Sequence, residues 1–384
     1  MKTANKTVTA TRLVKDALEK AKHFSDYNIF TFLNEEGALK KAAEIDEKIA
    51  RGEKVGRLAG VPYALKDNFL SPEGPTTASA HILEGMVSPI TATAVAKLEA
   101  EGAIMIGRTN LDAFAHGSST ENSYYGPTLN SADKERVAGG SSGGSAVAVA
   151  LDIVQFATGT DTGGSIRQPA SFNGVYGLKP TFGTISRYGV VAMASSTDCI
   201  GFFTKTPDDM NLLMSVASGQ DPKDMTTLPD YYNSTEKVED TSKKRIGIIK
   251  DFDNESVHPE IREALKKKCD ELKAKGHEIV ELEMPALKYA LAAYYIIVPA
   301  EVASNLSRYD GVRYGFRSEE SKDLDSLYGN TRNEGFMPEN KRRIMIGNFV
   351  LSSGFYDAYF LKAAKARTLI VKEYEDAFSK CDFI

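Results

Sequence analysis

The sequence is poor in cysteine, and the few cysteines it has do not suit a metal site. Its 384 residues include three cysteines, Cys199, Cys269 and Cys381, which lie far apart and show no metal-ligand spacing. An odd number of cysteines in a chain of this size is typical of a reducing compartment. We therefore expect an intracellular protein with no bound metal.

An excess of positive charge and a long apolar run are also missing. Lys and Arg number 47 against 52 Asp and Glu, a net charge of −5, which argues against a surface that coats nucleic acid directly. A partner that holds RNA on behalf of this chain is not excluded. No apolar segment approaches the roughly 20 residues of a membrane-spanning helix. Residues 1–10 are polar and do not form a secretory signal, so we expect a cytoplasmic protein that does not bind membranes.

The pattern of apolar residues predicts an α/β protein. Helical spacing occurs at residues 7–24, 39–49, 91–101 and 259–275, and short apolar runs predict strands at 61–65, 103–106, 153–157, 245–250 and 278–282. Residues 226–244 are polar and predict a surface loop, and residues 287–379 are mostly helical by pattern. This alternation favours a mixed sheet between layers of helices. Without a repeat or a low-complexity linker, we expect a single domain over residues 1–384.

The first unusual segment is Gly-Gly-Ser-Ser-Gly-Gly-Ser at residues 139–145. It is not a phosphate loop, because no Lys-Ser or Lys-Thr follows at the required spacing. It formally fits the G-x-S-x-G nucleophile elbow, but that motif needs a buried strand before it and a catalytic histidine after it. Residues 133–136 are charged, and the downstream His258 and His277 stand beside charged residues. A flexible Gly/Ser loop remains the alternative.

The second segment is Gly-Thr-Asp-Thr-Gly-Gly-Ser at residues 159–165. Two glycines directly before a serine allow a tight turn that exposes consecutive backbone N–H groups. Such donors form an oxyanion hole, in which each donor contributes about 2.7–4 kcal/mol to catalysis. The candidate donors are the N–H groups of Thr162, Gly163, Gly164 and Ser165. An ordinary turn would have the same composition.

The third segment places Lys66 at the end of the apolar strand 61–65. Lysines are mostly exposed, and the simplest interpretation is that Lys66 extends its amine to water. If the amine is instead buried among hydroxyl groups, desolvation lowers its pKa from about 10.4 and gives a neutral amine at working pH. A neutral amine can act as a general base.

Together, the three segments resemble the amidase signature family of Ser-Ser-Lys hydrolases in order and in spacing. The resemblance implies a central mixed β-sheet covered on both faces by helices. It also implies Ser165 as the nucleophile, Ser141 as a bridging serine joined to its neighbour by a cis peptide, and Lys66 as the base. Lys66 would take the proton of Ser141, which in turn takes that of Ser165. Asp161 and Arg167 are interpreted as partners that brace the turn.

Further segments resemble the glutaminase subunits of tRNA-dependent amidotransferases, namely residues 117–123, 126–128, 305–315 and 341–359. The resemblance implies that the chain hydrolyses L-glutamine and passes ammonia to a larger partner, the B subunit, which holds the mischarged tRNA and uses ATP and Mg²⁺. A small third protein, the C subunit, would complete a heterotrimer, and this chain would need no cofactor. The resemblance also suggests Arg343 for the glutamine α-carboxylate, through its planar fork, and Tyr295 for the edge of the substrate. The alternatives are a surface arginine and a tyrosine that packs between helices.

Three features depart from that family pattern. Ala138 replaces a common proline, and His116 replaces a common apolar residue and is interpreted as a wall of the site rather than a catalytic group. The chain ends at Ile384, where family members continue with late strands and an acidic residue for the substrate α-amino group. We therefore expect a C-terminally truncated chain whose triad is intact.

Two other functions remain open on the sequence. A stand-alone amidase would use the same triad on other carboxamides. A non-catalytic assembly protein would keep only its contacts with the B and C subunits.

Overall fold

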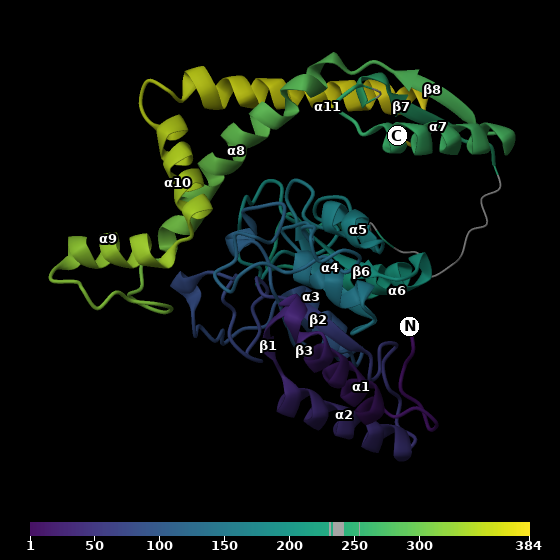
Figure 1. The fold of residues 1–384 in the computed structure, drawn as a ribbon, viewed down its shortest axis with the longest axis vertical. Coiled ribbons are helices and arrows are strands. Elements are labelled where there is room, and N and C mark those ends of the chain that lie inside the picture. The colour runs from purple at the N-terminus through teal and green to yellow at the C-terminus, as the bar shows by residue number, and fades with distance from the viewer. Residues whose placement is uncertain (230–231, 233–241, 253) are drawn as a thin grey trace. The chain divides into compact units, whose positions relative to one another are not determined.

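The computed structural model describes residues 1–229, 232, 242–252 and 254–384 (Figure 1). Residues 230–231 and 233–241 of the predicted loop 226–244 therefore lie outside the described residues. The chain divides into two compact units, residues 1–235 with 301–345 and residues 236–300 with 346–384. The single domain expected from the sequence stays a prediction.

The first unit is built on a mixed six-stranded sheet of order β1-β3-β2-β4-β6-β5. Its strands are β1 Phe30–Leu33, β2 Pro62–Lys66, β3 Ile104–Thr109, β4 Phe156–Asp161, β5 Tyr176–Leu178 and β6 Cys199–Thr204. The strand β2 runs parallel to both β3 and β4, and the remaining pairs are antiparallel. The predicted mixed sheet is confirmed. The strand predicted at 153–157 is displaced toward the C-terminus, and β1, β5 and β6 were not predicted.

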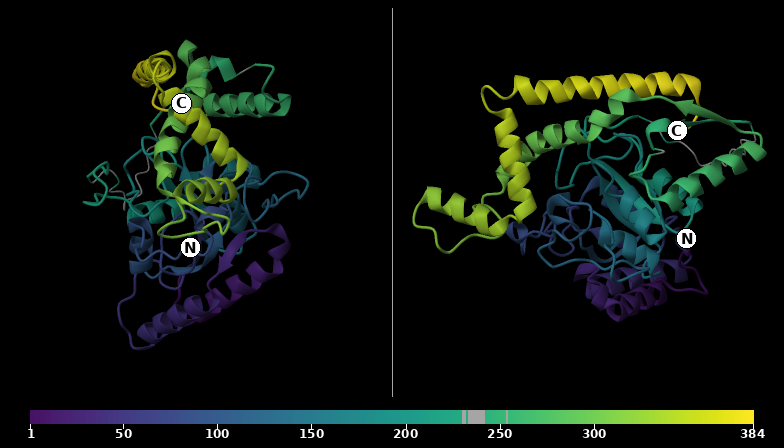
Figure 2. Two further views of the ribbon diagram at one scale, coloured as in Figure 1. Left: turned by 90° about the vertical axis from the view of Figure 1, so that its left-hand side faces the viewer. Right: turned by 45° about the horizontal axis from the view of Figure 1, so that its top comes forward.

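Helices cover both faces of this sheet, as predicted. On one face, α1 Ala10–His23, α2 Glu35–Ala50, α4 Gly143–Ala150 and α5 Arg167–Asn173 pack on apolar side chains of β2, β3, β4 and β6. The helices α1 and α2 run side by side along this face (Figures 1 and 2). On the other face lie α3 Thr93–Ala100 and α6 Pro207–Ala217. Because β2 is a central strand between two helical layers, all five of its residues are buried, including Lys66.

The ends of the helices follow local sequence signals. Thr9 precedes α1 and its hydroxyl accepts a hydrogen bond from the N–H of Arg12 at 3.1 Å. After α2, Gly52 has a φ of +75°, and after α3, Gly102 has a φ of +88°. Glycine adopts this left-handed conformation without a steric penalty, which explains why both helices end there.

The second unit contains the parallel pair β7 Arg245–Ile249 and β8 Glu278–Leu282. The helix α11 Lys362–Lys380 packs on one face of this pair through Ala377, which joins a cluster with Ile249 and Leu282. The helix α7 Pro259–Ala274 packs on the pair through contacts with β8. The predictions for 245–250, 259–275 and 278–282 are thus confirmed within a residue or so.

The mostly helical segment 287–379 is also confirmed. It contains α8 Ala290–Asn305, α9 Leu324–Gly335, α10 Pro338–Leu351 and α11. Both α8 and α10 begin in one compact unit and end in the other.

One described helix is long and apolar enough to span a membrane by length and composition, which corrects the expectation that no segment comes close. It is Pro285–Arg308, with a mean hydropathy of 1.3 and a share of 39% buried in the protein. One such helix is weak evidence, because core helices of soluble proteins pass the same test. Near the end of α8, Glu301 accepts hydrogen bonds from Ser196, and Asn305 donates to the carbonyl of Met193 at 3.1 Å.

Candidate active site

The amine of Lys66 lies inside the protein among three hydroxyl groups. Its Nζ is 2.9 Å from the Oγ of Ser141, 2.7 Å from the Oγ of Ser142 and 2.8 Å from the Oγ1 of Thr160. Lys66 and Ser141 are both fully buried. The structure thus excludes a lysine that extends to water and brings the predicted base and the predicted bridging serine into direct contact.

Burial sets the protonation of this amine. Desolvation lowers the pKa of Lys66 to about 7, although the carboxylates of Asp112, Asp161 and Asp198 act in the opposite direction. None of these carboxylates is among the hydrogen-bond partners of Nζ, which are all hydroxyl or carbonyl oxygens. A substantial fraction of Lys66 is therefore neutral near pH 7.

The neighbours of Lys66 determine which atom its lone pair faces. The hydroxyl of Ser142 donates to the carbonyl of Thr160 at 3.3 Å, and the Oγ1 of Thr160 also accepts from Asn68 at 3.1 Å. The hydrogen of Ser142 is thus directed to that carbonyl, and its oxygen accepts from Lys66. A neutral amine has two N–H donors and one lone pair, so it can donate to Ser142 and Thr160 and accept from the hydroxyl of Ser141.

The loop that carries Ser141 is held by hydrogen bonds that need small residues. The peptide bond between Gly140 and Ser141 is cis, as the family resemblance implied. The Oγ1 of Thr120 accepts from the N–H of Gly143 at 3.1 Å and donates to the carbonyl of Gly139 at 2.8 Å. A Cβ on Gly140 would lie 2.1 Å from the Oδ2 of Asp112, so a side chain does not fit there. The composition of segment 139–145 therefore reflects close packing rather than a flexible loop.

The turn that carries Ser165 is organised by the buried carboxylate of Asp161. Its Oδ1 accepts from the N–H of Gly164 at 2.8 Å, and its Oδ2 accepts from the N–H of Ile166 at 3.0 Å. Arg167 pairs with the same carboxylate at 2.9 Å. Burial alone would raise the pKa of Asp161, but the bonds from Arg167 and the backbone outweigh it and the pKa is lowered. Asp161 and Arg167 thus brace the turn, as predicted.

The same geometry corrects one predicted oxyanion donor. The N–H of Gly164 is directed to Asp161 and is therefore committed within the turn. Of the four N–H groups predicted from the sequence, this leaves those of Thr162, Gly163 and Ser165 as candidate oxyanion donors. The side chain of Thr162 is itself fixed, because its Oγ1 donates to Asp198 at 2.6 Å.

Ser165 contacts the Lys66 cluster, which consists of Lys66, Ser141, Ser142 and Thr160, through its backbone. Its carbonyl accepts from the N–H of Ser142 at 3.2 Å, and its side chain is nearly buried. Within the described part of the chain, its hydroxyl forms no hydrogen bond with that of Ser141. Catalytic hydrogen bonds are often long in substrate-free enzymes and shorten when substrate binds.

The two residues predicted to bind substrate lie in different units. Arg343, on α10 in the first unit, is buried, and its Nε donates to Glu339 at 2.9 Å, so it is not a surface arginine. Tyr295, on α8 in the second unit, is 45% exposed and contacts Tyr294 edge-on with ring centres 5.2 Å apart. Their roles in substrate binding stay predictions.

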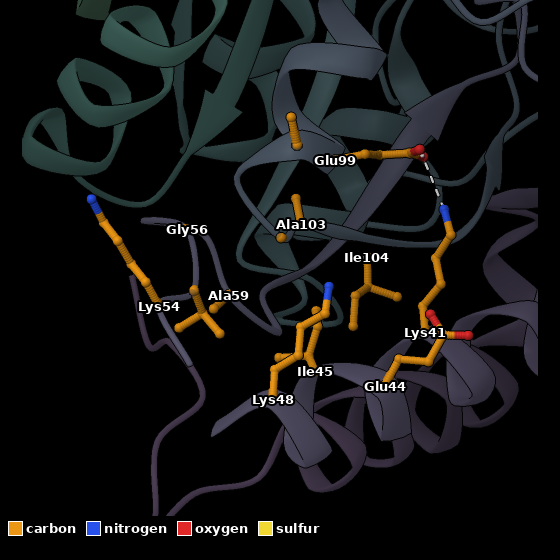
Figure 3. Close-up of a pocket in the computed structure, with 13 residues that line it drawn as sticks. Lys41, Glu44, Ile45, Lys48, Lys54, Gly56, Ala59, Glu99, Ala103 and Ile104 are labelled. Atoms are coloured by element: carbon orange, nitrogen blue, oxygen red, sulfur yellow. Dashed lines mark ion pairs between the residues drawn. The ribbon is translucent and has the colours of Figure 1, made fainter. Parts of the chain in front are cut away.

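A pocket elsewhere in the first unit carries none of the predicted site residues. It has a volume of about 370 Å³ and lies between α2 and the segment that includes α3 and the start of β3. Figure 3 shows Lys41, Lys48 and Lys54 around it, with Lys41 paired with Glu99 at 3.3 Å. It contains no serine and no buried base, so the Lys66 cluster remains the candidate active site.

Comparison with known proteins identifies the family of this chain. The family model described as Amidase matches residues 12–384. The chain belongs to the amidase family. It is 49% identical over 381 residues to the A subunit of glutamyl-tRNA(Gln) amidotransferase from Cyanothece sp., covering 98% of this chain and 79% of that protein. The corresponding protein of Agathobacter rectalis is 49% identical, covering 99% of this chain and 76% of that protein.

A solved structure confirms the fold of this amidase. The crystal structure of the glutamyl-tRNA(Gln) amidotransferase A subunit from Thermotoga maritima superimposes with a TM-score of 0.76. The two chains are 37% identical, and the match covers 97% of this chain and 74% of the other. The predicted family and fold are therefore both confirmed.

Sequence reasoning missed several residues that build the site of this amidase. Ser142 and Thr160 stand inside the quoted motifs but were given no role, although each contacts the amine of Lys66. Asp112 was not noticed, yet its carboxylate accepts from the N–H groups of Thr120 and Asn122. The available signal was the density of hydroxyl groups around each motif, but which hydroxyl faces Lys66 depends on strand pairing.

In the described residues no group of three or more His, Cys, Asp or Glu side chains could hold a metal ion.

Proposed function

We propose that this chain is the glutaminase subunit of a tRNA-dependent amidotransferase, in which it hydrolyses L-glutamine to glutamate and ammonia. The observation that carries the proposal is the buried amine of Lys66 in contact with Ser141, on a chain about half identical to the A subunits of glutamyl-tRNA(Gln) amidotransferases.

The proposed mechanism combines the observed contact of Lys66 with Ser141 and the Ser-Ser-Lys relay that the family resemblance implies. Neutral Lys66 accepts the proton of Ser141, and Ser141 accepts that of Ser165 as its Oγ attacks the carboxamide carbon. The N–H groups of Thr162, Gly163 and Ser165 stabilise the oxyanion that forms. The C–N bond then breaks, the proton returns through the relay to the nitrogen, and ammonia leaves an acyl-enzyme that water hydrolyses to glutamate.

The proposed complex accounts for the charge of the chain. A net charge of −5 suits a protein that does not itself bind RNA. The ammonia would pass to the B subunit, which holds the mischarged tRNA and uses ATP and Mg²⁺, with the C subunit joining the two. We place this heterotrimer in the cytoplasm, and propose that it converts Glu-tRNA(Gln), and in some cells Asp-tRNA(Asn), to the amidated form.

The decisive experiment measures ammonia release from glutamine by the chain assembled with its partners. Ser165→Ala should lower ammonia release by about a thousandfold or more while leaving assembly intact, because only the nucleophile is lost. Ser379→Ala, an exposed serine on α11, is the matched control and should behave as the unsubstituted chain.

Two outcomes would overturn the proposal. If the unsubstituted chain assembles but releases no ammonia, it is a non-catalytic assembly protein. If it turns over a hydrophobic amide much faster than glutamine, it is a stand-alone amidase.

A further inference from the structure

His116 is a fully buried histidine whose tautomer is fixed by its neighbours. Its Nδ1 lies 2.6 Å from the Nδ2 of Asn340. The orientation of that amide is set on both sides, since Nδ2 also donates to the carbonyl of Ala113 at 2.9 Å and Oδ1 accepts from the N–H of Met337 at 3.3 Å. The Nδ1 of His116 is therefore an acceptor, and in the neutral ring the hydrogen is on Nε2.

The Nε2–H group of His116 is left without an acceptor. Among the described residues it is one of the few buried side-chain nitrogens with no hydrogen-bond partner. Burial, with the nearby charge of Arg343, keeps the pKa of His116 well below its usual value, so the ring stays neutral. An unsatisfied buried donor is costly, and this one is explained by an acceptor that is not part of the chain.

The surroundings of His116 indicate what that acceptor is. Asn340 and Arg343 are three residues apart on α10 and thus lie on the same side of the helix, and Arg343 is close enough to influence the titration of His116. A guanidinium and an Nε2–H group are both donors and cannot satisfy each other. Arg343 is already paired with Glu339 at 2.9 Å, and an anionic oxygen placed beside the guanidinium would also accept from Nε2–H.

The loop of His116 is also connected to the catalytic serines. Two residues after His116, the carbonyl of Ser118 accepts from the Nε2 of Gln168 at 2.8 Å. The Oε1 of Gln168 accepts from the N–H of Gly140, the neighbour of Ser141, at 2.8 Å. One glutamine side chain thus joins the loop of His116 to the loop of the relay.

We propose that His116 is a substrate-binding residue whose Nε2–H donates to the α-carboxylate of glutamine beside Arg343. This inference rests on the proposed glutaminase function and replaces the interpretation of His116 as an inert wall. A neutral donor beside one arginine recognises a single carboxylate without adding a second positive charge to the site.

Two substitutions separate this role from a merely structural one. Asn at position 116 keeps an oxygen near the position of Nδ1 for the bond with Asn340 but has no atom at the position of Nε2. Gln reaches the position of Nε2 with an N–H donor. The probe for the carboxylate is 4-aminobutanamide, which is glutamine without its α-carboxylate.

In the assembled complex, His116→Asn should raise the KM for glutamine about tenfold to a hundredfold with little change in kcat, because a hydrogen bond to a charged group is lost. His116→Gln should restore most of the affinity. The KM for 4-aminobutanamide should be the same in all three proteins. Calorimetric titration of glutamine into the Ser165→Ala chain, with and without His116→Asn, tests the same difference without turnover.

Three results would contradict this inference, and each has a different meaning. If His116→Asn binds glutamine like the unsubstituted chain while His116→Gln is impaired, the residue is structural and the inference is wrong. If His116→Asn weakens glutamine and 4-aminobutanamide equally, the contact is not to the carboxylate and the inference is also wrong. If the unsubstituted complex releases no ammonia from glutamine, the proposed function fails and this inference fails with it.

Discussion

A buried lysine among hydroxyl groups is an unusual base, because its strength depends on the absence of a partner carboxylate. In the part of the chain that the structure describes, the hydrogen-bond partners of the Nζ of Lys66 are oxygens of Ser141, Ser142 and Thr160. A carboxylate in contact would stabilise the ammonium ion and keep the amine protonated at neutral pH. The carboxylates of Asp112, Asp161 and Asp198 instead accept hydrogen bonds from backbone N–H groups and from other side chains.

This arrangement predicts the pH dependence of the reaction. Because the pKa of Lys66 is lowered to about 7 and the neutral form is the base, kcat for ammonia release should rise with pH through about 7 and then level off. A rate profile measured between about pH 5.5 and 9 tests this. Lys66→Arg should lose activity by about a thousandfold at every pH, because a guanidinium stays protonated. A flat profile for the unsubstituted chain would contradict the assignment of Lys66 as the base.

At the scale of the elements, the site is made where two neighbouring strands end. The strand β2 ends at Lys66, and its parallel neighbour β4 ends at Asp161, directly before the turn that carries Ser165. The helix α4 begins two residues after Ser141. The proposed base, bridging serine and nucleophile thus come from three connections at one edge of the sheet.

The turn after β4 should depend on Asp161 far more than on Arg167. Asp161→Asn replaces one of the two acceptor oxygens by an NH2 donor, so the N–H group of either Gly164 or Ile166 loses its acceptor. The turn and its oxyanion donors should then lose their alignment, and kcat should fall about tenfold or more. Arg167→Gln should change kcat by less than about threefold, because the arginine side chain is 55% exposed and its ion pair is screened. Steady-state kinetics on both variants, with thermal melting to check folding, makes the comparison. Equal losses in the two variants would assign the bracing to the ion pair instead.

At the scale of the whole molecule, the two units differ in how much apolar surface they bury. Among the described residues of the first unit, a large cluster of buried apolar side chains lies on each face of the sheet. The clusters described in the second unit are small, and none of the residues of α7 is buried.

This difference predicts unequal hydrogen exchange. Amides of β2 and β4 should exchange orders of magnitude more slowly than those of α7 and β8, because regions with few buried contacts open at lower free energy. Hydrogen exchange followed by mass spectrometry on the full chain gives the comparison peptide by peptide. Protection of α7 equal to that of β4 would show that the second unit is as stable as the first.

The sequence located the residues that meet at the site better than the limits of its strands, for a physical reason. The strand β4 begins where the apolar run ends. Its later residues, Thr158 to Asp161, are polar or glycine, because they contribute to the site rather than to the hydrophobic core. The Oγ1 of Thr158, for example, accepts from the N–H of Lys66 at 2.9 Å. Periodicity therefore located only the beginning of this strand.

Long-range contacts were beyond the reach of the sequence pattern. The contact of Ser142 with Lys66 and the commitment of Gly164 to Asp161 depend on the pairing of β2 with β4 and on the path of one turn. The helices were simpler to predict, because caps such as Thr9 and terminal glycines such as Gly52 act within a few residues.

The central position of β2 has a consequence for how such an enzyme changes over time. The base of the proposed relay is on a strand that is buried on both faces, whereas Arg343, the predicted partner of the substrate carboxylate, is on a separate helix distant in sequence. Under the proposed function, mutations in the helical segment can alter which amide is accepted while the residues that break the bond stay in place. A lineage of such enzymes can acquire a new substrate, or lose an old one, without first losing its catalytic residues.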